Sequence, residues 1–211
     1  MAVEGNLDLF SAQFPASLVP RVMQLVLDSW AEFKTSQTEE TQITLEFFVL
    51  LNQNQEFSRL PFLIDPEIIL PTGIGTEQIG RLDLRFTHGQ LRKVYFSIEC
   101  KRLRVTFPSG KFESLAGEYV AEGMCRYFNG QYARGLDKGG MLAYVMDGDI
   151  ANAIENIRTA VESRRTHLNM DTNSTICACS VLSHDYIKET SHNYGPKDRF
   201  KIFHIFLPMP S

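Results

Sequence analysis

An acid and a base lie side by side in a segment that otherwise has the pattern of a buried strand. From residue 94 to residue 101 the side chains alternate, so Glu99 and Lys101 share one face of the predicted strand. Asp83 is similarly placed, because Leu82 and Leu84 flank it in the segment before. Buried charges are costly unless they are paired or bind a metal, so these three residues point to a site. The other face of the strand is apolar and consists of Val94, Phe96, Ile98 and Cys100.

The order of helical and strand patterns around these charges predicts an α/β fold. Apolar residues at helical spacing predict a helix over 17–34 and a second that begins at Ser36 or Thr38, either of which can cap it. The first three strands should form an antiparallel meander, and the fourth, reached through a crossover helix, should be parallel to a strand already in the sheet. After the second helix, which ends near 52–55, the expected elements are strands over 62–70, 78–86 and 93–103, a helix over 114–128, a loop over 130–140, a strand over 141–146, a helix over 150–164, and strands over 176–182 and 200–207.

Helices on both faces of a mixed sheet bury these apolar patterns most simply, which predicts three layers. The chain has no internal repeat and no long linker, so we expect a single domain over residues 1–211. Neither a membrane span nor a secretory signal is recognisable, and we expect a soluble cytoplasmic protein without membrane contact. The four cysteines lack the spacing of a metal site and are expected to be buried, reduced thiols: Cys100, Cys125, Cys177 and Cys179.

The formal net charge of −4 counts against a general binder of polyanions, because such proteins usually carry a basic excess. The argument is weak, since a carboxylate-rich metal site is itself acidic and local patches decide contact. Each basic patch of this chain is equally well explained as a solvated surface. The patches are Arg102 with Arg104, Arg164 with Arg165, and Lys197 and Arg199 with Lys201.

If the strands over 78–86 and 93–103 pair, Asp83 lies within reach of Glu99. Two converging carboxylates are what a hard cation such as Mg²⁺ requires, and the backbone carbonyl of Cys100 could be a further ligand. Such a cation would polarise a phosphate and lower the pKa of a bound water, which Lys101 could orient. On the residues alone, the alternative is a structural ion pair of Lys101 with Glu99 or Asp83 at a sheet edge.

Asp83, fifteen intervening residues and Glu99-Cys100-Lys101 resemble the motif of the PD-(D/E)xK nucleases, with Leu82 where the motif has proline. The resemblance covers about 39–146, where the predicted order of elements is similar to the family's α-β-β-β-α-β core. It implies a restriction-endonuclease-like fold that hydrolyses phosphodiesters with Mg²⁺ or Mn²⁺. Asp83 and Glu99 would hold the metal and Lys101 would assist the attacking water. The motif leaves DNA and RNA open, and DNA is the substrate that we expect first.

Many members of that family add a glutamate from the helix ahead of the sheet. The candidates here are Glu39, Glu40 and Glu46. Glu40 shares a helical face with Ile43 and Phe47, so we expect its side chain to lean toward the sheet and to support the site. The alternative is a favourable negative charge at a helix N-terminus.

Weaker signals mark residues that could contact the substrate. Glu67, on the first strand, lies near the metal or faces water. Arg126 is four residues from Glu122, a spacing that favours a surface ion pair over a role in the cleft. Tyr132 lies in a loop that is typical either of nucleic-acid contacts or of a simple turn.

Histidines occur late in the chain without the spacing of a zinc site. His184, at the end of a predicted strand, is the one best placed to contact a phosphate. His204 alternates with apolar residues, which predicts an exposed position on one face of its strand.

The sequence therefore predicts a magnesium-dependent nuclease that cleaves DNA, as the effector of an antiviral defence or restriction system. With 211 residues there is little room for a target-reading domain, so specificity would come from a partner subunit or a homo-oligomer. Two alternatives remain open, a catalytically silent scaffold with the nuclease fold and a hydrolase of small phosphoesters. The intact set of Asp83, Glu99 and Lys101 disfavours the scaffold.

Overall fold

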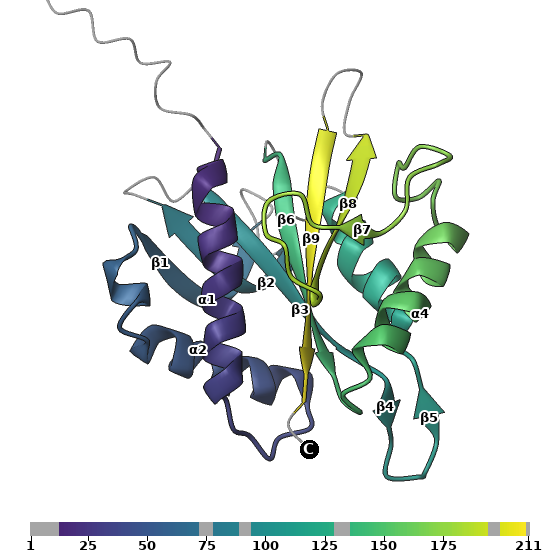
Figure 1. The fold of residues 1–211 in the computed structure, drawn as a ribbon, viewed down its shortest axis with the longest axis horizontal. Coiled ribbons are helices and arrows are strands. Elements are labelled where there is room, and N and C mark those ends of the chain that lie inside the picture. The colour runs from purple at the N-terminus through teal and green to yellow at the C-terminus, as the bar shows by residue number, and fades with distance from the viewer. Residues whose placement is uncertain (1–12, 72–77, 89–93, 129–135, 194–198, 210–211) are drawn as a thin grey trace, which may run out of the picture.

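The computed structural model describes residues 13–71, 78–88, 94–128, 136–193 and 199–209, with only the backbone described for 67–71 and 78–82. Within them the chain has an α/β fold around a mixed seven-stranded sheet, which confirms the predicted class (Figure 1). The strands follow the order β1-β2-β3-β6-β9-β8-β7 across the sheet. Their bounds are β1 Phe62–Pro71, β2 Gln78–His88, β3 Tyr95–Leu103, β6 Lys138–Val145, β7 Cys177–Ala178, β8 Ile187–Asn193 and β9 Arg199–Pro208, and a separate hairpin consists of β4 Val105–Thr106 and β5 Phe112–Glu113.

The strand directions confirm the predicted meander and crossover. β1 pairs antiparallel with β2, and β2 pairs antiparallel with β3. The helical segment after β5 then returns the chain so that β6 lies parallel to β3. β9 lies parallel to β6 on its other side, and β8, which precedes β9 in the chain, pairs antiparallel with β9.

Helices cover both faces of the sheet, as predicted. α1 (Val19–Glu32) and α2 (Glu40–Gln53) pack on one face, and Figure 1 shows α1 in front of the strands. The segment after β5 and α4 (Ile150–Ser163) pack on the other. Alternation along the strands divides the core: Ile98, Cys100, Leu142, Tyr144 and Ile205 face the α1 side, and Leu103, Met141, Ala143, Val145 and Ile202 face the α4 side.

The start of α2 differs from the prediction. The helix begins at Glu40, and the residue at its N-cap is Glu39, which makes no side-chain capping bond. Neither Ser36 nor Thr38 caps it. The Thr38 carbonyl instead accepts a hydrogen bond from the Arg102 guanidinium at 2.6 Å, which ties the entry of the helix to the end of β3.

The helix predicted over 114–128 is broken into three short turns. They are α3 (Ala116–Glu118), the π-helical turn η4 (Tyr119–Gly123) and the 3-10 turn η5 (Met124–Tyr127). A Cβ on Gly123 would lie 2.3 Å from Met141 Cε and 3.8 Å from Glu99 Cγ. The backbone at Gly123 thus lies directly against the sheet, and the widened π turn accommodates this approach.

β6 begins three residues earlier than predicted, because two glycines that are typical of a loop serve close packing instead. A Cβ on Gly139 would lie 2.4 Å from the Tyr127 ring, and one on Gly140 would lie 2.9 Å from Ile98. The strand passes under these side chains only because both positions lack a side chain.

The C-terminal strands are the least well predicted. The strand expected over 176–182 is limited to β7 (Cys177–Ala178), and β8 was missed because its sequence is largely polar.

The expected burial of all four thiols is also wrong, since Cys177 is exposed. His204 was expected to be exposed but is fully buried. No helix of the described part of the chain is long and apolar enough to cross a membrane.

Candidate active site

β2 and β3 separate at the position of the predicted site. They pair from Thr87 opposite Tyr95 to Leu84 opposite Ile98. Beyond that point β2 continues on β1 and β3 continues on β6. Asp83 lies at the start of this split, and its Oδ2 accepts a hydrogen bond from the Cys100 backbone N–H at 2.7 Å. A side-chain carboxylate thus takes the place of a backbone partner between the strands.

Glu99 is the most buried charge of the site, with 1% of its side chain exposed. Its Oε1 is 3.0 Å from Lys101 Nζ and 2.7 Å from Arg126 Nη1. Its Oε2 is buried and has no hydrogen-bond partner among the described residues. One oxygen therefore holds two cations while the other is an unsatisfied acceptor, which is an unfavourable state for a buried carboxylate.

Lys101 is held from three sides. Its Nζ contacts Glu40 Oε1 at 3.0 Å and the Cys100 carbonyl at 2.9 Å, in addition to Glu99. Glu40 also accepts a hydrogen bond from the Arg102 backbone N–H, through Oε2 at 2.9 Å. Both oxygens of Glu40 thus bind β3, and the ammonium is fixed beside the carbonyl that we expected as a metal ligand.

The structure distinguishes the three glutamates of the preceding helix. Glu40 is the one that contacts Lys101. Glu39 pairs with the Arg102 guanidinium at 3.3 Å on the surface. Glu46 accepts hydrogen bonds from Thr35 and Gln37, away from the site. The prediction that Glu40 leans toward the sheet is confirmed.

Burial and mutual repulsion shift the pKa values of the site carboxylates upward. Burial raises the pKa of Asp83 to about 6, against the opposing effect of Lys101. Burial and the neighbouring Asp83 raise the pKa of Glu99 to about 7, although Lys101 and Arg126 act in the other direction. Burial lowers the pKa of Lys101, but Glu99, Glu40 and Asp83 together more than offset it, so its pKa is raised. Ionisation of both carboxylates is thus costly in this buried site.

The donor set fits a hard divalent cation, although no ready-made cage is present. Among the residues that the structure describes, no three His, Cys, Asp or Glu side chains are arranged to hold a metal ion. Asp83 is engaged with a backbone N–H, and Glu99 with two cations. The buried, unpartnered Oε2 of Glu99 beside Asp83 is the observation that fits a cation, since carboxylate and carbonyl oxygens are the ligands that Mg²⁺ prefers.

Arg126 belongs to the site more than to the surface. Its contact with Glu122, which favoured a surface pair, is 3.8 Å long, whereas its bond to Glu99 is 2.7 Å long. The expected pair with Glu122 is therefore present, together with a closer contact to the site. The helical spacing to Glu122 was visible in the sequence, but nothing in it reveals that η5 turns Arg126 toward β3.

His184 is not brought to these residues. His184 precedes β8, which lies three strands from β3 in the sheet, and its Nδ1 accepts a hydrogen bond from the Tyr186 N–H at 3.1 Å. The side chain of Glu67 and the whole of Tyr132 lie outside the described residues.

A surface pocket of about 360 Å³ lies where β3 leads into β4. Its arginines are already paired: Arg104 lies 2.8 Å from Asp147 and 3.4 Å from Asp149, and Arg102 pairs with Glu39. The pocket therefore has no net excess of basic charge with which to attract a polyanion. Its lining consists of Thr38, Glu39, Arg102, Arg104, Val105, Thr106, Phe107, Pro108, Met146 and Asp147.

Comparisons of the chain with known protein families, with curated proteins and with solved structures give no match. The resemblance to the PD-(D/E)xK nucleases thus stays a prediction from the motif.

Proposed function

We propose that this protein is a metal-dependent nuclease with a restriction-endonuclease-like core. The observation that supports it best is the meeting of Asp83, Glu99 and Lys101 where β2 and β3 separate. The meander, the crossover and the parallel fourth strand agree with the α-β-β-β-α-β order. DNA as the substrate, a partner subunit or homo-oligomer, and a role as a defence effector are parts of the same proposal, which rest on the resemblance.

The residues divide the chemistry between them. Asp83, Glu99 and the Cys100 carbonyl would hold Mg²⁺ or Mn²⁺, which supplies Lewis-acid activation of the phosphate and of water. Lys101, once its contact with that carbonyl is released, presents an ammonium to the attacking water or to the charge that develops on the phosphate. Glu40 keeps this ammonium in place and protonated.

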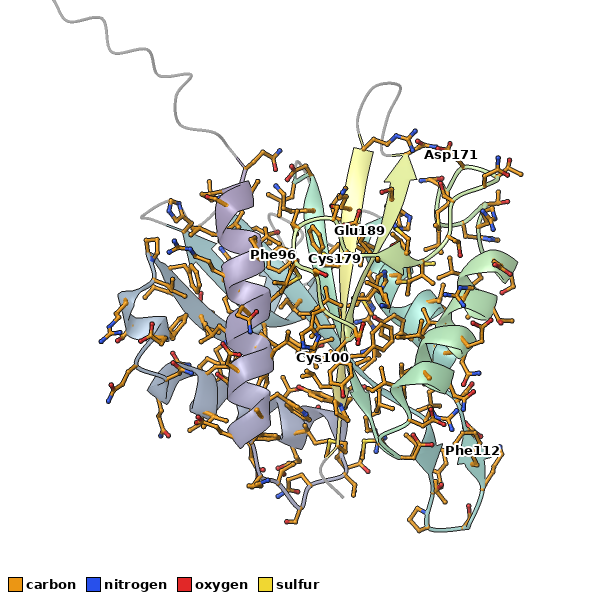
Figure 2. All side chains as sticks on the ribbon, in the orientation of Figure 1. Phe96, Cys100, Phe112, Asp171, Cys179 and Glu189 are labelled. Atoms are coloured by element: carbon orange, nitrogen blue, oxygen red, sulfur yellow. The ribbon has the colours of Figure 1, made fainter. Side chains whose placement is uncertain are left out.

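The test is calorimetric titration of Mg²⁺ and Mn²⁺ into the wild type, Asp83→Ala and Lys101→Ala, with cleavage of plasmid DNA and of RNA assayed on the same samples. We expect Asp83→Ala to lose both metal binding and cleavage, and Lys101→Ala to keep metal binding while it loses cleavage. Asp171→Ala is the matched control, because this exposed carboxylate pairs with Arg199 and lies at the upper edge of the view in Figure 2, away from Cys100. Metal binding that is the same in the wild type and Asp83→Ala would exclude this site.

A silent scaffold is the second candidate, and one observation favours it. Glu99 and Lys101 are already paired with each other, and Arg126 and Glu40 extend this pair to a network of four charges. If the wild type binds no Mn²⁺ and cleaves nothing, even with its natural partner, these charges are a structural network and the scaffold explains them.

A further inference from the structure

We propose that Arg126 is an internal counter-ion that occupies Glu99 while the site holds no metal, and that a divalent cation must displace it. This inference rests on the proposed function and concerns the regulation of the same site. It assigns Arg126 a positioning role that the motif does not contain.

The ion pair is asymmetric in a way that decides which partner can move. Glu99 lies within the sheet, and 1% of its side chain is exposed. β3 pairs with β6 at Glu99 itself and with β2 up to the preceding residue, Ile98. Arg126 reaches it from the short turn η5, and 30% of its side chain is exposed. The carboxylate is therefore fixed, and the guanidinium is the partner that can leave toward solvent.

Two cationic side chains, Lys101 and Arg126, already occupy Glu99 where a metal ion would bind. Arg126 and Lys101 both lie on Oε1, so the carboxylate is already shared by two cations while Oε2 has no partner. A divalent cation brought to Glu99 would be close to both positive groups, and like charges at such distances repel strongly in a buried site. Lys101 is retained by Glu40 and is 15% exposed, against 30% for Arg126, so Arg126 is the cation that gives way.

A second acid is in place to receive the released group. Glu122 Oε2 is 3.8 Å from Arg126 Nη2, and Glu122 is 66% exposed. Rotation of the guanidinium away from Glu99 thus keeps an ion pair and moves a bidentate donor to the solvent side of the site. A guanidinium in that position suits the phosphate oxygens of a polynucleotide, so metal binding and substrate binding would be coupled through one side chain.

Titration of Mn²⁺ without substrate tests the displacement directly. We expect Arg126→Gln to bind Mn²⁺ on the order of tenfold more tightly than the wild type, which corresponds to about 1.4 kcal/mol. Arg126→Lys keeps the cation and should stay within about threefold of the wild type. Arg158→Gln removes the same charge from a surface pair on α4 and controls for net charge, with an expected change below about twofold.

The outcomes separate this inference from the proposed function. Equal or weaker Mn²⁺ binding by Arg126→Gln, in a wild type that does bind Mn²⁺ through Asp83, overturns the counter-ion role alone. An equal gain in Arg158→Gln or in Arg126→Lys also overturns it. If the wild type binds no Mn²⁺, the proposed function falls first.

A measurement on the wild type avoids any dependence on how the variants fold. Phenylglyoxal modifies exposed arginines, and mass spectrometry locates the modified residue. We expect Mn²⁺ to raise the rate of modification at Arg126 and to leave the rate at Arg158 unchanged. A rate at Arg126 that stays constant or falls with Mn²⁺ contradicts the displacement.

Discussion

Glu40 joins α2 to β3 through both of its oxygens. Oε1 accepts from Lys101 Nζ and Oε2 from the Arg102 backbone N–H. In Glu40→Gln the amide nitrogen must face one of these two donors, so Lys101 loses its fixed position. If the proposed function holds, we expect cleavage to fall by about tenfold or more, within the range known for misplaced catalytic groups, while Mn²⁺ affinity changes by less than about threefold.

Glu39→Gln is the matched control for this variant, because Glu39 is the next residue and is 70% exposed in its pair with Arg102. We expect it to cleave like the wild type. Parallel titrations and single-turnover assays of both variants provide the comparison. Equal losses in the two would mean that only the negative charge at the helix N-terminus matters.

The sequence predicts the positions of some site residues and misses those of other buried polar residues. Asp83, Glu99 and Lys101 stand out because charges inside apolar strands need partners, and Glu40 follows from its helical face. Arg126 and His204 could not be placed, because their partners come from elements distant in the chain. Whether an arginine faces a buried acid, or a histidine faces a buried hydroxyl, depends on tertiary packing that no local pattern contains.

The elements η5 and β6 pack closely against each other at Gly139. A Cβ there would lie 2.4 Å from the ring of Tyr127, which is rigid and whose hydroxyl donates to the Gly140 carbonyl at 2.8 Å. We expect Gly139→Ala to lower the free energy of unfolding by about 1–3 kcal/mol, as overpacked cores do. Urea unfolding followed by circular dichroism measures the change.

Gly117→Ala provides the control in the same helical segment. A Cβ at Gly117 meets nothing within 4 Å, and the position is helical. Its expected effect is neutral or a stabilisation of about 0.4–1 kcal/mol, because alanine restricts the unfolded chain. The packing argument fails if the two variants have the same stability.

Helices and strands with one apolar face were predicted to within a few residues, whereas β8 was missed. Glu189, Thr190 and His192 are buried in β8, and each is satisfied by hydrogen bonds rather than by apolar contacts. A strand stabilised in this way has no apolar alternation to detect. The breaks in the helix predicted over 114–128 were missed for a related reason. They accompany the close approach of Gly123 to Met141, which is distant in the chain.

Across the whole molecule, a buried chain of hydrogen bonds joins η4 to β8 and β9. The Leu168 carbonyl can only accept, so His192 donates from Nδ1 at 2.7 Å and accepts from Thr190 through Nε2. Thr190 then accepts from His204 Nε2, and Tyr119 donates to His204 Nδ1 at 2.9 Å. This order requires both histidines to be neutral. Burial lowers the pKa of His192 to about 4 and that of His204 to about 3, which agrees with it.

Two pairs of buried groups therefore respond to pH in opposite directions. The folded-state pKa values of His192 and His204 lie below the ordinary 6.5, so their contribution to stability is present above pH 6.5 and is lost as the pH falls toward 3. The pKa values of Asp83 and Glu99 are raised above 3.8 and 4.5, so their contribution is present at low pH and is lost as the pH rises through about 6 to 7. Between pH 4.5 and 6.5 the two effects oppose each other.

Removal of the two site carboxylates should expose the effect of the histidines. In metal-free buffer we expect the stability of Asp83→Asn/Glu99→Gln to rise with pH between 4.5 and 6.5 more steeply than that of the wild type. The difference in slope can reach about 2.7 kcal/mol per pH unit, since each proton contributes about 1.4. Urea unfolding at several pH values with a chelator measures both profiles.

Asp171→Asn is the control, because hydrogen bonds from Asn193 and Arg199 lower the pKa of Asp171 and confine its effect to more acidic solution. Its profile should run parallel to that of the wild type in this window. Parallel profiles for the double variant as well would mean that Asp83 and Glu99 are ionised throughout this window. A steeper profile would show that ionisation of these carboxylates destabilises the metal-free fold, so that a cation bound there would stabilise it by RT ln(1 + c/Kd), where c is the concentration of the free cation.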